Sequence, residues 1–132
     1  MATFSMDWIG DLNFRSGEGE PELELFSGTP GKLSPMMALA YAQVGCMGMD
    51  VVHVITKGRC DLRALKVTLE GERAPEPPRR YLSIKLHFDI TGNVDPHKVD
   101  RAIQLSRDKY CSVWNSLRSD IKLETSYTIH AS

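Results

Sequence analysis

Three cysteines, Cys46, Cys60 and Cys111, are the side chains of this sequence best suited to chemistry. A thiolate can attack a peroxide or a disulfide, and two thiols that meet can form a disulfide themselves. Their number is odd and no two lie close together in the sequence, which argues against a secreted disulfide framework and against a zinc site. We therefore expect a reducing, cytoplasmic compartment, no bound metal and no cofactor.

Charged neighbours distinguish two of these thiols. Arg107 lies four residues before Cys111, on the same face of a predicted helix, where its charge would favour the Cys111 thiolate. Asp50 lies four residues after Cys46 and would oppose a thiolate there. His53 is about 10 Å from Cys46 along a helix axis, too far for a direct pair. A reactive Cys46 thus requires a cation from another part of the chain.

The first cysteine must be positioned by a helix that starts at Pro35 and ends near Lys57. Ser34 offers an oxygen that caps the helix start, Pro35 suits the first turn, and Gly58 is a typical stop. Apolar residues fall on every side of this helix, which predicts that it is buried. Its apolar stretch is too short, and too soon followed by Asp50, His53 and Lys57, to span a bilayer, which takes about 20 apolar residues. Cys46 could also be no more than a small buried hydrophobe.

A second helix, from Pro96 to about Arg118, must position Cys111. Asp95 is its expected cap, and its apolar residues repeat with the helical period. Each helix carries one cysteine near its middle, so Cys46 and Cys111 can face each other if the helices pack together. A disulfide would then need Cα atoms about 4.4–6.8 Å apart. Cys60 follows the end of the first helix and is expected to take no part.

The other segments alternate in the manner of strands, which gives the order βββ-α-ββ-α-β and an α+β fold with antiparallel sheets. The expected strands cover residues 3–9, 12–14, 23–26, 65–73, 81–91 and 121–129. The first three are too short to bury a face by themselves, so they must join a sheet elsewhere in the chain or on another chain.

Composition places the chain among ordinary globular proteins. Of its 132 residues, 42% are hydrophobic and 25% charged, which suits one domain over residues 1–132. The formal net charge of −1 and the lack of a basic block exclude nucleic acid as an expected partner. The first dozen residues lack a basic segment followed by an apolar run, so we expect no secretory signal and no membrane anchor.

Four segments together resemble the OsmC/Ohr superfamily, and within it the YhfA-like branch. The segment Ser34–Val52 resembles its first cysteine helix, Val67–Gly92 its central hairpin, Val99–Leu117 its second cysteine helix and Trp8–Leu12 its opening strand. The resemblance covers nearly the whole chain. It implies an intertwined homodimer in which residues 1–30 of one subunit join the sheet of the other.

The resemblance also implies a thiol peroxidase that reduces organic hydroperoxides in the response to oxidative or osmotic stress. Cys46 matches the peroxidatic cysteine and Cys111 the resolving one, and a thiol reductant would regenerate both. Family peroxidases carry a glutamate just after the helix-opening proline, which orients an activating arginine. Here Met36 and Met37 stand there, and Arg15 is the candidate arginine.

That departure keeps a second function open. The same apolar helix could line a cleft at the dimer interface that holds a small lipophilic molecule, with the cysteines as remnants. The enzyme and the binding protein are distinguished by whether Cys46 and Cys111 lie within reach of each other, and by whether an arginine reaches Cys46.

Overall fold

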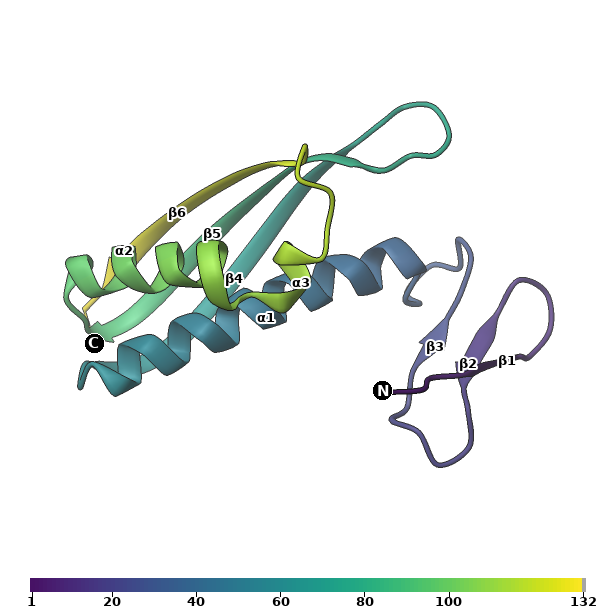
Figure 1. The fold of residues 1–132 in the computed structure, drawn as a ribbon, viewed down its shortest axis with the longest axis horizontal. Coiled ribbons are helices and arrows are strands. Elements are labelled where there is room, and N and C mark those ends of the chain that lie inside the picture. The colour runs from purple at the N-terminus through teal and green to yellow at the C-terminus, as the bar shows by residue number, and fades with distance from the viewer. Residues whose placement is uncertain (132) are drawn as a thin grey trace. The chain divides into compact units, whose positions relative to one another are not determined.

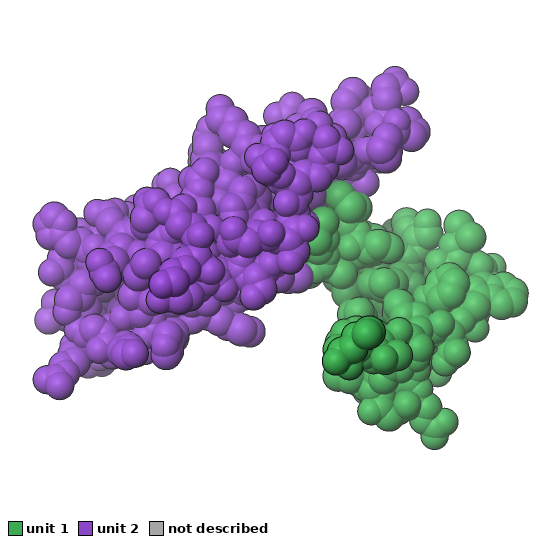
Figure 2. All heavy atoms as spheres, viewed as in Figure 1, with its two compact units in different colours: residues 1–41 green, residues 42–132 purple. Residues whose placement is uncertain are grey.

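A computed structural model describes residues 1–131 of the chain (Figure 1). The elements are, in order, β1 (Met6–Trp8), β2 (Phe14–Ser16), β3 (Glu24–Leu25), α1 (Pro35–Lys57), β4 (Asp61–Arg73), β5 (Tyr81–Asn93), α2 (Pro96–Leu105), the π-helical segment η1 (Ser106–Tyr110), α3 (Ser112–Asn115) and β6 (Lys122–His130). They form two compact units, of which the first is Met1–Tyr41 and the second begins at Ala42 (Figure 2).

The first unit is built on an antiparallel sheet of order β1-β2-β3. Trp8 pairs with Phe14, and Phe14 pairs with Leu25. Gly10, at a φ of 110°, and Asp11, at 48°, make the turn between the first two strands. The three predicted strands are therefore present: β1 and β3 are shorter than expected, and β2 has the expected length but begins two residues later. Large apolar side chains on this unit face solvent in the single chain, including Trp8 at 67% exposure.

The second unit is built on a sheet of order β4-β5-β6, with α1 and α2 on one face (Figure 1). β4 and β5 form the predicted hairpin, in which Leu69 pairs with Leu86. β5 and β6 are parallel, so the prediction of purely antiparallel sheets is wrong for this pair. The reason is the connection: the segment from α2 to α3 crosses over the sheet and returns the chain in the same direction, as a parallel pair requires.

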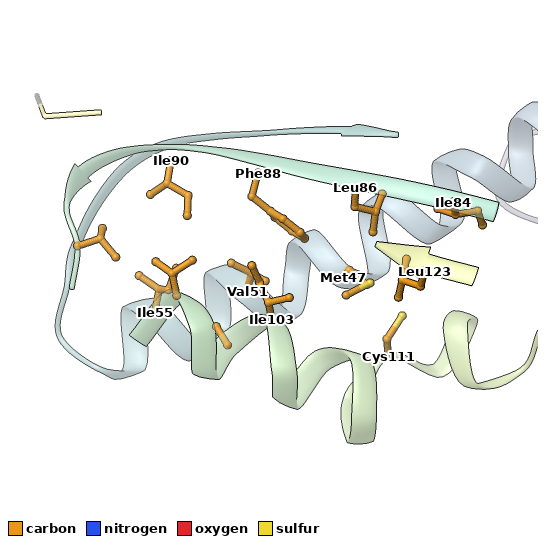
Figure 3. Packing of buried hydrophobic residues seen from close by; sticks show 13 residues of the cluster. Met47, Val51, Ile55, Ile84, Leu86, Phe88, Ile90, Ile103, Cys111 and Leu123 are labelled. Carbon is orange, nitrogen blue, oxygen red and sulfur yellow. The ribbon is translucent and has the colours of Figure 1, made fainter. Parts of the chain in front are cut away.

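The core of this unit lies between the sheet and the two helices (Figure 3). Every second residue of β5 points into it, because side chains alternate across a strand. Helix α1 contributes residues four apart, which share a face of a helix. The fully buried members from these elements are Leu86, Phe88 and Ile90 of β5, Met47, Val51 and Ile55 of α1, and Val99 and Ala102 of α2.

Helix α1 has the predicted bounds and the predicted cap. The N–H of Met37 donates to Ser34 Oγ at 3.3 Å. The helix is not buried all round, however, because the sheet covers only one side of it in the single chain. Tyr41 and Met49 are 66% and 75% exposed. By length and composition alone α1 could also cross a membrane, a test that core helices of soluble proteins meet as well, and its Met47 stripe lies in the core.

The second cysteine helix is broken where one continuous helix was predicted. The N–H of Cys111 donates to Ser106 O at 2.8 Å, an i to i+5 bond that widens the last turn into a π-helix. Cys111 itself is extended, with φ −72° and ψ 101°, and it caps the short helix α3. The side chain of Asn115 closes the break by donating to Arg107 O and Cys111 O. The thiol is thus held at a helix end and not at mid-helix.

Candidate active site

Two sulfur atoms and a carboxylate meet where α1 passes the break before α3. Cys46 Sγ, Cys111 Sγ and an oxygen of Asp50 all lie within 4.8 Å of one another. Cys46 and Asp50 share a face of α1 because they are four residues apart. The structure thus brings together the two cysteines that the sequence pairs, and it adds a negative charge beside them.

The two thiols differ in their access to solvent. Cys111 is fully buried in the core beside Leu123 (Figure 3), and Cys46 is half-buried at the edge of the same cluster. The pKa of Cys111 is raised to about 11, mainly by burial and in smaller part by the hydrogen bond and charge of Cys46 and the charge of Asp50. The N–H of Trp114, which donates to Cys111 Sγ at 3.3 Å, acts in the opposite direction. Cys111 is therefore a protonated thiol at neutral pH.

Asp50 is held in place by a buried serine. Ser106 Oγ donates to Asp50 Oδ2 at 2.7 Å, and Ser106 has no exposed surface. Ser106 lies on the apolar stripe of the second helix, where a hydroxyl costs free energy unless it is bonded. A polar residue such as Ser106 among the apolar residues of a helix stripe must find a hydrogen-bond partner in the core. This pattern is the sequence signal that could have indicated the contact with Asp50.

Gln43 gives the same signal on α1. It is fully buried, four residues before Met47 on the buried stripe. Its Nε2 donates to Cys111 Sγ at 3.8 Å, a weak bond to sulfur, and its Oε1 is buried without a partner among the described residues. A buried polar atom without a hydrogen-bond partner lowers the free energy of unfolding by roughly 1–3 kcal/mol, and such atoms are rare in folded proteins.

The remaining residues singled out from the sequence lie elsewhere. Arg107 lines a pocket with Gln104 and Tyr127, and it is not among the groups that shift the pKa of Cys111, so the expected support of the Cys111 thiolate by Arg107 is not found. The physical reason is the π-helical turn, which removes the four-residue helical spacing between them. Arg15 lies in β2 of the first unit, 3.9 Å from Glu24 and largely exposed. Cys60 follows α1 and packs against the core outside the thiol cluster.

A cleft of about 530 Å³ opens beside the cluster, between α1 and α2. Asp50 forms part of its wall, together with the cations Lys57 and Arg101 and the ring of Tyr110. The carboxylate therefore stands between the two sulfurs and an opening to solvent.

Cys111 should make the stability of the reduced protein depend on alkaline pH. Its pKa is about 11 in the folded chain against an ordinary value of 9.0, so unfolding releases a proton between these limits. The stabilisation is therefore complete below about pH 9 and is lost as the pH rises to about 11. Urea unfolding from pH 8 to 11, with reductant and chelator present, should show a steeper fall in unfolding free energy for the native chain than for Cys111→Ala. Parallel pH profiles would contradict this assignment.

Comparison with known proteins agrees with this architecture. Residues 28–126 match the family model described as OsmC-like protein. Protein YhfA of Escherichia coli K12 is 36% identical over 127 residues, which are 94% of this chain and 95% of that protein.

Solved structures share the fold. A hypothetical protein from Aquifex aeolicus has a TM-score of 0.91 at 25% identity and covers 100% of this chain and 98% of its own. An organic hydroperoxide resistance protein OsmC from Legionella pneumophila has a TM-score of 0.72 at 19% identity and covers 97% of this chain and 98% of its own. The family match over three quarters of the sequence and the identity to YhfA lead to one conclusion: the chain belongs to the OsmC-like protein family.

Proposed function

We propose that this protein is a thiol-dependent peroxidase that reduces organic hydroperoxides through Cys46 and Cys111. The observation that carries the proposal is the approach of the two sulfur atoms to within 4.8 Å, one half-buried and the other fully buried. A peroxidatic thiol must meet its substrate, and a resolving thiol must reach the oxidised sulfur. The half-buried Cys46 therefore suits the peroxidatic role, and the fully buried Cys111 suits the resolving role.

The reaction proceeds in three balanced steps. The Cys46 thiolate attacks one oxygen of the hydroperoxide, the O–O bond breaks, and the alkoxide leaves and takes a proton as an alcohol, so that sulfur becomes a sulfenic acid. The Cys111 thiol then displaces water from that sulfur and forms the disulfide. An external dithiol reduces the disulfide by exchange and is itself oxidised.

The raised pKa of Cys111 serves both early steps. A protonated Cys111 can donate its S–H to the sulfur of Cys46, and this contact itself contributes to the raised pKa of Cys111. Once Cys46 has become a neutral sulfenic acid, its charge no longer raises the pKa of Cys111. The resolving thiol therefore becomes easier to ionise at the moment when it must attack.

Disulfide closure requires the sulfur atoms to move together to about 2.05 Å. The break at Cys111 favours this movement, because an extended residue between η1 and α3 can rotate without unwinding a helix. Family membership supports the same chemistry, since related folds include proteins named for organic hydroperoxide resistance. We place the activity in the cytoplasm, in the response to oxidative or osmotic stress.

One equivalent of cumene hydroperoxide should convert the reduced protein into a chain with a Cys46–Cys111 disulfide. Peptide mass analysis after alkylation of the remaining thiols measures the pairing, and Cys60 should be alkylated throughout. Cys60→Ser is the matched control and should oxidise at the native rate. A dominant bridge to Cys60 would overturn the proposed pair.

A second function is favoured by a separate observation. Apolar residues of α1 and β4 line an open groove of about 590 Å³, whose members include Val44, Gly48, Met49, Val52, Leu65 and Val67. A small lipophilic molecule would fit such a surface. If Cys46 stays reduced in excess hydroperoxide, while an apolar dye binds and Met49→Glu abolishes that binding, the protein is a binding protein and not a peroxidase.

We also propose that the active form is a homodimer in which the first 30 residues join the partner's sheet, so that residues 1–132 form one functional domain. Its support is the apolar surface left open in the single chain, which includes Trp8, Leu12 and Met49 at 67%, 73% and 75% exposure. Each of the two units thus exposes large apolar side chains, and exposed apolar surface of this kind is typical of interfaces. Sedimentation at micromolar concentration should give twice the chain mass of 14.8 kDa. A stable species of 14.8 kDa would contradict the dimer.

A further inference from the structure

We propose that the reduced protein binds one thiophilic divalent cation, with Zn²⁺ as the type, between Cys46 Sγ, Cys111 Sγ and the Asp50 carboxylate. This proposal does not depend on peroxidase activity, because metal binding requires only that the two thiols are reduced. The sequence spacing did not indicate it: two ligands come from one helix turn of α1 and the third from the distant break before α3, whereas zinc motifs are recognised by short spacings.

The three donor atoms are nearly as close to one another as the ligands of one metal ion are. All three lie within 4.8 Å of one another. Zinc binds thiolate sulfur at about 2.3 Å and carboxylate oxygen at about 2.0–2.2 Å, so two sulfurs on a tetrahedral ion are about 3.8 Å apart. Closing the remaining ångström or so takes small side-chain rotations. The extended backbone at Cys111 leaves its side chain free of the constraints of a helix interior.

The carboxylate already has the support that metal ligands have. Ser106 Oγ donates to Asp50 Oδ2 at 2.7 Å from a fully buried position. This bond fixes one carboxylate oxygen and leaves the other available. Outer hydrogen bonds of this kind orient ligands at metal sites, and their loss typically lowers affinity by about 10–100-fold.

Gln43 is the independent observation that indicates a missing ligand. It is fully buried, its Oε1 has no partner among the described residues, and its Nε2 lies 3.8 Å from Cys111 Sγ. A half-turn of the amide exchanges the two atoms and directs the oxygen toward the sulfur cluster. There it can serve as the fourth donor, which would complete a tetrahedral set and satisfy the orphaned atom.

The negative charges of the site also favour a divalent cation. Without a cation, a carboxylate faces two sulfurs, and either thiolate would be repelled by it. A divalent cation would neutralise two of the three negative charges while each thiol gives its proton to solvent. The carboxylate, which is unfavourable beside a lone thiolate, thus becomes favourable beside a metal.

Cobalt is the probe for this site, because thiolate ligands give bound Co²⁺ intense near-ultraviolet charge-transfer absorption. We expect the chelator-treated, reduced full chain to bind one Co²⁺ with that absorption and to release it to Zn²⁺. Oxidation to the Cys46–Cys111 disulfide should abolish binding. Asp50→Asn and Ser106→Ala should each weaken the affinity by about tenfold or more, and Cys60→Ser should bind as the native chain does.

Gln43→Leu tests the site independently if Asp50→Asn or Ser106→Ala fails to fold. It should weaken Co²⁺ binding while the unfolding free energy of the metal-free protein is unchanged or higher, because an unsatisfied polar atom is removed. Absence of thiolate-to-cobalt absorption in the native reduced chain would overturn the site. A loss of Co²⁺ affinity in Cys60→Ser as large as in Asp50→Asn would overturn it too. Peroxide turnover is measured separately with chelator present, so that the failure of either proposal can be recognised alone.

Discussion

Replacing Cys46 with serine should abolish hydroperoxide reduction, with a loss of roughly 10³-fold or more, as for other essential nucleophiles. A serine hydroxyl cannot take up the oxygen that sulfur accepts, so no sulfenic acid forms. Cys111→Ser should behave differently. It retains the attacking sulfur, so it should consume one equivalent of cumene hydroperoxide and then stop with a sulfenic acid on Cys46, which dimedone traps.

The proposed assignment of Cys46 as the attacking thiol and Cys111 as the resolving thiol is based on burial, and these variants can contradict it. Cys111 is fully buried and its pKa is raised to about 11, whereas Cys46 is half-buried and lies nearer solvent. Cys60→Ser is the control for thiol loss as such and should keep native turnover. If Cys111→Ser is the inert variant, and dimedone labels Cys111 in Cys46→Ser, the roles are exchanged. If both variants turn over at the native rate, neither thiol carries the reaction.

The sequence predicts the helix start and the long hairpin well, because these depend on local patterns. Ser34 and Asp95 cap helices where expected, and their side-chain oxygens accept from Met37 N and His97 N. The alternation of β5 places Phe88 in the core as predicted. Local capping and binary patterning are decided within a few residues, and so they are visible without the fold.

Features that depend on contacts between distant segments could not be predicted in the same way. The parallel pairing of β5 with β6 is set by the crossover and not by the strand pattern, which is the same for either direction. The π-helical turn before Cys111 leaves no clear local signal, since the residues of η1 are compatible with an α-helix. It nevertheless decides the site, because it moves Cys111 from a helix interior to a cap.

Arg15 shows a further limit of the sequence. The family resemblance makes it the candidate for the activating cation, but within its own unit it lies beside Glu24. Met36 and Met37 stand at the start of α1, where family peroxidases carry the glutamate that orients this arginine. A proposal that Arg15 activates Cys46 therefore depends on the proposed dimer, in which the first 30 residues would join the partner's sheet.

Gly92→Ala should be the most destabilising single-methyl change in the second unit. Gly92 has a φ of 143°, which only glycine adopts readily, and a methyl group there would lie 2.1 Å from the backbone oxygen of Asp61. That oxygen belongs to β4 at the pairing point where Leu62 meets Gly92, so neither backbone can give way without opening the hairpin. We expect the free energy of unfolding to fall by roughly 3–5 kcal/mol.

The effect should reach the site, because β5 leads directly into α2 and the break that holds Cys111. Urea denaturation of the reduced variant measures the stability, and the rate of Cys111 alkylation at pH 8 measures exposure of the site. Gly19→Ala is the matched control: its φ of 81° is also positive, but nothing lies within 4 Å of the added carbon. It carries the backbone strain without the clash and should cost only about 1–2 kcal/mol. Equal losses in the two variants would mean that the close approach of Asp61 does not limit the β4–β5 hairpin.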